Sequence, residues 1–385
     1  MYFILLQVRA AAGQKDSLKR QVRRLKKGNN PTEPASISTI PHPLPVQYTK
    51  TSPEDDRQFL IYDNGSESNR VLVFSSDIGL QLLAEADTWF MDGTHSTCPT
   101  QFQQLFCVRV PLGNSHVSAV YALLPSKLQS TYEECLTSIL DTCLQNNQRP
   151  NPSTVVIDYE VAIHNAVRSV VSPNIRIQGC FYHLTQSTWR RVQAEGLQSR
   201  YADDEETRDS VGMIDGLAFL PIDCVKDGMS VLQEVVPDHL RGLLEYFDGN
   251  YVSGCYRSVL GSSGVMRFRR TPPRFELQTW NVHDATMSDQ HRTNNVCESW
   301  NNGFKSLVGH SNPSLWTVIQ SLQKDCAMVE TDHYKFEHGE PVSKRVKKAT
   351  IVHQNRLKLL CQQQLKGEKS LSEFLYAIGK CIRLK

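Results

Sequence analysis

The fold is decided by residues 88 to 124, TWFMDGTHSTCPTQFQQLFCVRVPLGNSHVSAVYALL, which contain three short apolar runs separated by turn residues. The runs Thr88–Asp92, Gln104–Val110 and Val117–Leu124 are rich in β-branched and aromatic residues, and they lie close together, as the strands of an antiparallel meander do. We therefore predict three consecutive strands here. An earlier run, Val71–Phe74, predicts one more strand.

Helices and strands alternate after this meander. Apolar residues at helical spacing predict a helix over Thr131–Leu144, and the run TVVID at Thr154–Asp158 predicts a buried strand. A helix over 161–171, a strand over 175–179 and a helix from about residue 182 follow. Three strands followed by helix–strand units predict a mixed α/β sheet with helices on both faces.

The composition along the chain predicts five regions. Residues 1–58 combine a basic helix with a linker rich in Pro, Ser and Thr. Residues 59–199 and 286–330 are expected to form two parts of one α/β core, with a mostly helical insertion at 200–285 between them and a basic helical region at 331–385. The chain has 385 residues, of which 40% are hydrophobic, enough for a sizeable core. No stretch reaches the length of a membrane span.

The basic residues are concentrated in the segment Lys15–Lys27. It carries seven Lys or Arg and one Asp, whereas the net charge of the whole chain is only +2. The segment suits phosphate contacts or a nuclear address, and it equally suits a solvated helix that leads into a linker. The eleven Cys lack the regular spacing of a secreted disulfide scaffold, which favours a reducing compartment.

Two acids end predicted strands. Asp92 closes the first strand of the meander and Asp158 closes the run TVVID. Ligands of α/β sheets bind beyond the carboxyl ends of strands, and two carboxylates that share a site repel each other unless a cation lies between them. A divalent metal is therefore the natural occupant. The alternative is ordinary: Asp is also a common turn and helix-capping residue.

A third acid, Glu298, lies within Arg292–Gly309. One face of the predicted helix is apolar and is formed by Val296, Trp300, Gly303 and Leu307. The same spacing places Glu298 on another face with Asn294, Asn301 and Lys305. The amides are suited to orienting the acid or contacting a ligand, while a solvent-facing Glu is the simpler alternative.

Cys180 and His183 lie between the second and third acids. Their spacing allows sulfur and nitrogen to reach one metal ion, but such a pair is half of a zinc site, and no matching pair is evident in the sequence.

Four motifs in this order resemble the catalytic domain of Mutator-like element (MULE) transposases, particularly those found behind FLYWCH-type zinc fingers in animal proteins. The motifs are FMDGT at 90–94, VVIDYEVA at 155–162, GCFYHLTQ at 179–186 and NNVCESWN at 294–301. The resemblance covers roughly Phe59 to Val329. It implies a ribonuclease H-like fold with a five-stranded mixed sheet and an insertion before the last catalytic helix.

The resemblance also implies the chemistry. Asp92, Asp158 and Glu298 match the DDE triad, which holds two Mg²⁺ (or Mn²⁺) ions for nicking and transfer of DNA strands, with Asp92 between the ions. Cys180 and His183 match a Cys/His motif of the family. For this pair a zinc site, a His that reaches the scissile phosphate, and a purely structural pair all stay open.

DNA is the partner that the resemblance implies, both as element ends and as target, together with a homo-oligomer acting in the nucleus. No membrane partner is expected. The candidate DNA contacts are the amides that precede the Glu and the exposed cations of the helix, the insertion and the N-terminal segment: Asn294, Asn295, Lys305, Arg267, Arg269, Arg270, Lys19, Arg20, Arg23 and Arg24. Such cations position DNA without reading its sequence.

Two features depart from the family pattern. His95 stands where an aromatic residue often follows the Gly-Thr pair, and the first Cys is Cys98, so no cysteine of a zinc finger precedes the core in this chain. A truncated or domesticated copy fits these features. The functions to be separated are thus an active DDE transposase, a catalytically silent DNA- or chromatin-binding protein derived from one, and a nuclease that does not join strands.

Overall fold

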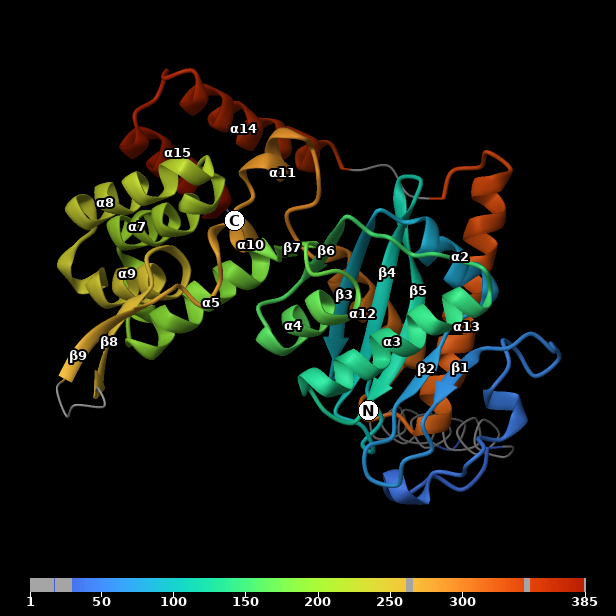
Figure 1. The fold of residues 1–385 in the computed structure, drawn as a ribbon. Coiled ribbons are helices and arrows are strands. Elements are labelled where there is room, and N and C mark those ends of the chain that lie inside the picture. Colours follow the sequence, from blue (N-terminus) through green and yellow to red (C-terminus); the bar gives the residue numbers. More distant parts are fainter. Residues whose placement is uncertain (1–16, 18–29, 261–265, 343–346, 384–385) are drawn as a thin grey trace, which may run out of the picture.

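A seven-stranded mixed sheet forms the centre of one lobe of the computed structural model, which describes residues 17, 30–260, 266–342 and 347–383 (Figure 1). The strand order is β1-β2-β5-β4-β3-β6-β7. The bounds are β1 Leu60–Asp63, β2 Leu72–Phe74, β3 Thr88–Thr94, β4 Gln104–Leu112, β5 Ser115–Leu124, β6 Thr154–Ile157 and β7 Arg176–Gly179. The predicted meander is β3, β4 and β5, which pair antiparallel, whereas β6 and β7 continue the sheet in parallel from β3.

The sheet has seven strands rather than the five that the resemblance implies, because two more strands extend it beyond β5. β2, which the run Val71–Phe74 predicts, pairs antiparallel with β5, and β1 pairs antiparallel with β2. The four residues of β1, LIYD, are each only half-buried. Pairing with β2 rather than a marked apolar pattern holds β1, so its sequence carries no clear strand signal.

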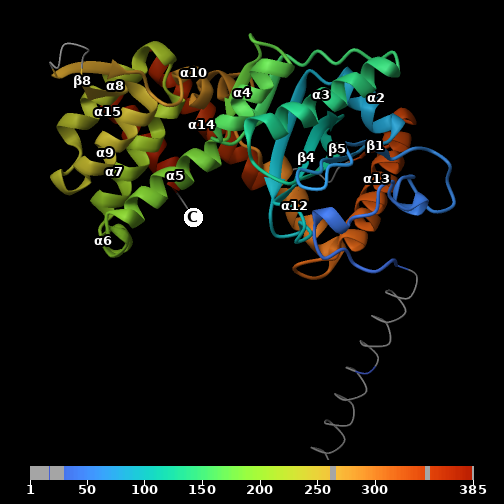
Figure 2. The same ribbon diagram turned by 60° about the horizontal axis from the view of Figure 1, so that its bottom comes forward.

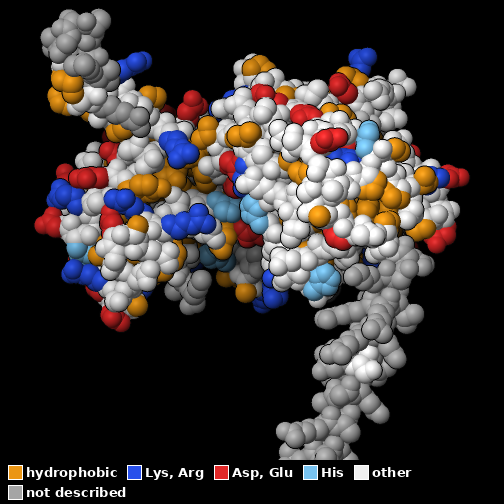
Figure 3. All heavy atoms as spheres, turned by 90° about the horizontal axis from the view of Figure 1, so that it is seen from below, with side chains coloured by type: hydrophobic (Ala, Val, Ile, Leu, Met, Phe, Trp, Pro, Cys, Tyr) orange, Lys and Arg blue, Asp and Glu red, His pale blue; other side chains and the backbone are white. Residues whose placement is uncertain are grey.

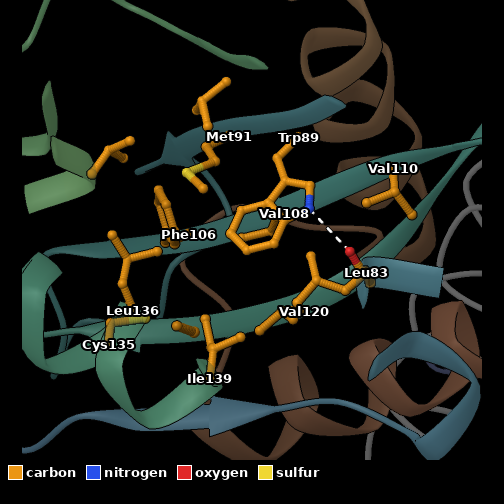
Figure 4. Close-up of a cluster of buried hydrophobic side chains, with 14 of the residues drawn as sticks. Leu83, Trp89, Met91, Phe106, Val108, Val110, Val120, Cys135, Leu136 and Ile139 are labelled. Atoms are coloured by element: carbon orange, nitrogen blue, oxygen red, sulfur yellow. Dashed lines mark hydrogen bonds between the residues drawn. The ribbon is translucent and has the colours of Figure 1, made fainter. Parts of the chain in front are cut away.

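One face of the sheet packs against α2 (Asp77–Glu85), α3 (Gln129–Gln145) and α4 (Val161–Val170). Trp89, Met91, Phe106 and Val108 project from β3 and β4 toward α3 in this cluster (Figure 4). The buried Trp89 satisfies its indole by donating to the carbonyl of Leu83 at 3.0 Å. This core fixes the position of the strand that carries Asp92.

The opposite face is covered by α12 (Asn295–Val308) and α13 (Leu315–Glu337). Trp300 and Phe304 of α12 stack with ring centroids 4.9 Å apart, in a cluster that includes Tyr121 of β5. The prediction that helices cover both faces is confirmed. Because α12 packs on this face, Glu298 lies next to the centre of the sheet.

Residues 30–58 were expected to form a linker, yet they pack onto the sheet lobe. They contain two short 3₁₀ turns, η1 (Ile37–Thr39) and η2 (Val46–Tyr48). Ile40, Leu44 and Tyr48 are buried in the same cluster as α13, and the ring of Tyr48 lies 4.5 Å from that of Trp316. The predicted basic helix Lys15–Lys27 lies outside the described residues except for Ser17.

A second lobe is mostly helical and lies beside the sheet lobe (Figure 2). It contains α5 Phe181–Ala194, α6 Gln198–Asp203, α7 Glu205–Gly216, α8 Val225–Val235, α9 Arg241–Phe247, α10 Leu277–Trp280, α11 His283–Met287, α14 Lys348–Leu365 and α15 Leu371–Arg383, with short turns η3 Leu217–Phe219, η4 Ile222–Cys224, η5 Asp238–Leu240 and η6 Asp248–Val252. The C-terminal helices α14 and α15 share one hydrophobic cluster with the insertion.

An antiparallel hairpin, β8 (Cys255–Leu260) and β9 (Met266–Thr271), extends from the helical lobe. This hairpin interrupts the region 200–285, which the sequence predicts as a mostly helical insertion. In the part of the chain that the structure describes, no helix has the length and apolar character needed to cross a membrane.

Candidate active site

Asp92 lies near the carboxyl end of β3, where two donors hold its side chain. The backbone N–H of Gly93 donates to one carboxylate oxygen at 2.9 Å, and the side-chain amide of Asn301 donates to the other at 2.8 Å. The second bond ties β3 to α12. A Cβ at Gly93 would lie 2.1 Å from the side-chain oxygen of Gln104, so a larger residue at position 93 would require that side chain to move.

Asp158 follows β6, the parallel neighbour of β3. Phe90 pairs with Val156, so continuing the same register brings Asp158 beside Asp92. Burial and the nearby charge of Asp158 raise the pKa of Asp92 to about 7. The Asp158 backbone is fixed in turn, since His164 donates from its Nε2 to the Asp158 carbonyl at 2.7 Å.

Glu298 lies in the first turn of α12. Burial raises its pKa, and the neighbouring His183 opposes that rise. The charge of Glu298 also contributes, as a smaller cause, to the raised pKa of Asp92. Asp158 and Glu298 therefore both lie close enough to Asp92 to disfavour its charge, and in the absence of a cation Asp92 takes up a proton more readily than a free carboxyl does.

Cys180 and His183 lie beside Glu298. One ligand atom from each of the three residues lies within 4.8 Å of the others. Cys180 is fully buried at the start of α5, where burial raises its pKa to about 11. The backbone N–H of Asn294 donates to the Cys180 sulfur at 3.1 Å. The turn after β7 is thereby joined to the turn that begins the Glu298 helix.

The prediction that Asn294 contacts DNA is wrong. Its side chain is fully buried and donates to the carbonyl of Met91 at 2.7 Å. It therefore attaches the start of α12 to β3, and it does not face solvent. Asn295 and Lys305 are exposed on the same helix, so these two positions stay open to a ligand.

A polar cleft of about 390 Å³ opens beside Asp158 and His183. The helical lobe contributes Arg190, Tyr246 and Arg274 to its lining. Arg190, Tyr246 and Arg274 are not among the site residues predicted from the sequence. Lobe packing, which no local pattern records, brings these residues to the carboxyl ends of the strands.

Seven further candidate DNA contacts are cations, three on β9 and four in the N-terminal segment. Arg267, Arg269 and Arg270 are exposed on β9. Lys19, Arg20, Arg23 and Arg24 lie outside the described residues. His95 is exposed and donates from its ring to the carbonyl of Gln103 at 2.5 Å. Seen from below, Lys and Arg side chains are spread over the helical lobe, and His side chains lie where the lobes meet (Figure 3).

Comparison with known proteins identifies the class to which this domain is similar. The family model named MULE transposase domain matches residues 88–187, from β3 into α5. The resemblance to MULE transposases is confirmed over this range, which includes Asp92, Asp158, Cys180 and His183 and ends before Glu298. None of the curated proteins matches the chain.

Proposed function

We propose that this protein is a transposase-derived enzyme that nicks DNA and transfers the resulting strand end in a reaction that depends on divalent metal ions. The observation that carries the proposal is the raised pKa of Asp92 beside Asp158 and Glu298, within a domain similar to MULE transposases. The order β5-β4-β3-β6-β7, with three antiparallel strands followed by two parallel ones, supports a ribonuclease H-like core.

The donors fit magnesium. Asp92 and Asp158 offer carboxylate oxygens, which Mg²⁺ prefers, and their mutual repulsion is the energetic signature of a site that a cation neutralises. Two such ions would activate the attacking oxygen and stabilise the leaving oxygen of a phosphodiester. In this assignment Asp92, Asp158 and Glu298 would hold the ions, with Asp92 shared by both, Asp158 serving one and Glu298 the other.

Residues of this chain would orient the ligands and the substrate. Asn301 fixes one carboxylate oxygen of Asp92 through its 2.8 Å hydrogen bond. Arg190 and Arg274 line the cleft at Asp158 and supply positive charge for DNA phosphates. The Arg residues of the β8–β9 hairpin offer a second contact region. A DNA substrate places this activity in the nucleus, and joining of two DNA ends calls for a second copy of the chain.

The test is a nicking assay on supercoiled plasmid DNA with Mg²⁺ or Mn²⁺. Nicking is expected for the wild-type chain and is expected to fall at least about 1,000-fold in Asp92→Asn, Asp158→Asn and Glu298→Gln, because each variant removes a metal ligand. Asp141→Asn, at an exposed position on α3, is the matched control and should nick normally.

Two outcomes would contradict the proposal. Equal nicking by the wild type and the three variants would show that the cleavage comes from another source. Retention of DNA without metal and without cleavage would instead indicate a catalytically silent DNA- or chromatin-binding protein.

A further inference from the structure

Cys180, His183 and Glu298 form a side-chain cluster with the composition of a transition-metal site. Among the described residues, this is the one group of three or more His, Cys, Asp or Glu whose ligand atoms lie within 4.8 Å of one another. It combines a sulfur, an imidazole nitrogen and a carboxylate oxygen. Thiolate and imidazole ligands select zinc over magnesium, whose ligands are oxygen atoms.

Two atoms of the cluster lack hydrogen-bond partners. Nδ1 of His183 and Oε1 of Glu298 are both buried, and neither has a partner in the described part of the chain. A buried polar atom without a partner is costly, because it has lost its water without gaining a replacement. A bound cation would give the carboxylate oxygen and the imidazole a partner at the same time.

The surroundings of the sulfur also fit a metal-bound thiolate. The backbone N–H of Asn294 donates to the Cys180 sulfur at 3.1 Å. The adjacent N–H of Phe181 donates to the carbonyl of Arg292 at 2.9 Å, which fixes the backbone on either side of the cluster. Such outer hydrogen bonds orient ligands and stabilise the charge of a bound thiolate.

The distances between the three ligand atoms are compatible with zinc binding after a small movement of the side chains. The ligands of a tetrahedral zinc ion with bonds of 2.0–2.3 Å lie about 3.5 Å apart. The ligand atoms of Cys180, His183 and Glu298 lie within 4.8 Å of one another. Side-chain rotation is expected to bring them to the shorter spacing when the ion binds. Three protein ligands leave the fourth coordination position of the zinc ion for water or another oxygen, which is the pattern of catalytic zinc sites.

We propose that Cys180, His183 and Glu298 bind one Zn²⁺ ion, which would take the place of the second magnesium ion that the proposed function assigns to Glu298. Zinc binding is argued from this geometry alone, while a role for the ion at the scissile phosphate rests on the proposed function. The centre would then hold two different metals, with the zinc ion facing the cleft that Asp158 and His183 line.

The test is metal binding by the purified full chain. After removal of metals with a chelator, the chain is titrated with Zn²⁺, and separately with Co²⁺ as a spectroscopic probe. One ion per chain is expected, together with a thiolate-to-cobalt charge-transfer band in the near ultraviolet. Cys180→Ser should remove that band, and His183→Gln and Glu298→Gln should weaken Zn²⁺ binding by more than about 100-fold.

Matched controls separate this proposal from the proposed function. Cys361→Ala removes a buried Cys of the helical lobe and should leave the cobalt band intact. Asp92→Asn should abolish nicking while zinc still binds. Thermal unfolding of each variant shows whether it folds. His183 and Glu298 are half-buried whereas Cys180 is fully buried, so His183→Gln and Glu298→Gln should disturb the fold less than Cys180→Ser.

Less than about half an ion per chain, or a cobalt spectrum that Cys180→Ser leaves unchanged, would overturn the zinc site. Neither result would affect the outcome of the nicking test. Zinc binding by a chain that never nicks DNA would instead support the zinc site and reject the proposed function.

Discussion

At the scale of single residues, the charge of Asp92 is expected to lower the stability of the metal-free protein while serving the proposed function. Its carboxylate is held by Gly93 and Asn301, while burial and Asp158 raise its pKa to about 7. A carboxyl whose pKa rises on folding stabilises the protein below its ordinary pKa near 4, and this contribution is lost as the pH rises through 7. At pH 8 without metal, the folded chain therefore carries an unfavourable charge.

Asp92→Asn should raise the free energy of unfolding of the metal-free protein at pH 8 by about 2 kcal/mol, because it removes this charge and keeps an acceptor for Gly93. The gain should shrink toward pH 4. Thermal unfolding in the presence of a chelator measures it, with Asp141→Asn as an exposed control. A less stable Asp92→Asn at pH 8 would show that the hydrogen bond from Asn301 outweighs the charge.

The placement of the three acids on their elements could be predicted from the sequence, because Asp92 lies near the end of an apolar strand, Asp158 follows one, and Glu298 lies on a regular helix. Local pattern did not reveal the role of Asn294, which matches the motif yet is buried against β3. It also did not reveal that Cys180 and His183 would meet Glu298. Both depend on where α12 packs, and that is set by contacts between residues more than 100 positions apart.

At the scale of elements, the β8–β9 hairpin exposes both cations and apolar side chains. Successive residues of a strand point to opposite faces, so Arg267 and Arg269 share one face of β9, while Met266, Phe268 and Arg270 share the other. Phe268 is 78% exposed and Met266 60% exposed. An exposed ribbon that carries both cations and large apolar groups is suited to contact with DNA.

Changing Arg267 and Arg269 together to Glu should weaken binding to duplex DNA by at least about tenfold and reduce the slope of log affinity against log salt by about 2, one unit per lost phosphate contact. Binding measured across a salt series tests this. Arg149→Glu, at an exposed site on the sheet lobe, is the control. If the slope of log affinity against log salt were unchanged in the double variant, the hairpin would not be a DNA contact.

The elements that sequence patterns missed share one physical property. β1 and the β8–β9 hairpin lack a buried apolar face, since β1 is half-buried and β9 is almost wholly exposed. Their backbone hydrogen bonds to a neighbouring strand define them, and those partners are invisible in local composition. The strands β3 to β7, whose side chains enter the core, were all predicted from their apolar runs.

At the scale of the whole molecule, the C-terminal helices complete the helical lobe. Phe374, Leu375 and Ile378 of α15 are fully buried in the cluster formed by the insertion. The basic composition of this region gave no sign of such a core. The packing depends on a close approach of backbones, because a Cβ added at Gly379 would lie 2.7 Å from the carbonyl carbon of Gly212.

Gly379→Ala should therefore destabilise the protein by about 1–3 kcal/mol, the usual range for overpacking, even though Ala favours a helix by about 1 kcal/mol over Gly. The obstructing atoms are backbone of α7, so no side chain can rotate away. The matched control is Gly303→Ala, since this helical Gly has nothing within 4 Å of an added Cβ and should gain up to about 1 kcal/mol. Thermal unfolding gives both values, and limited proteolysis should release the C-terminal helices of Gly379→Ala first. If both variants gained stability equally, the close contact of α7 and α15 would be refuted.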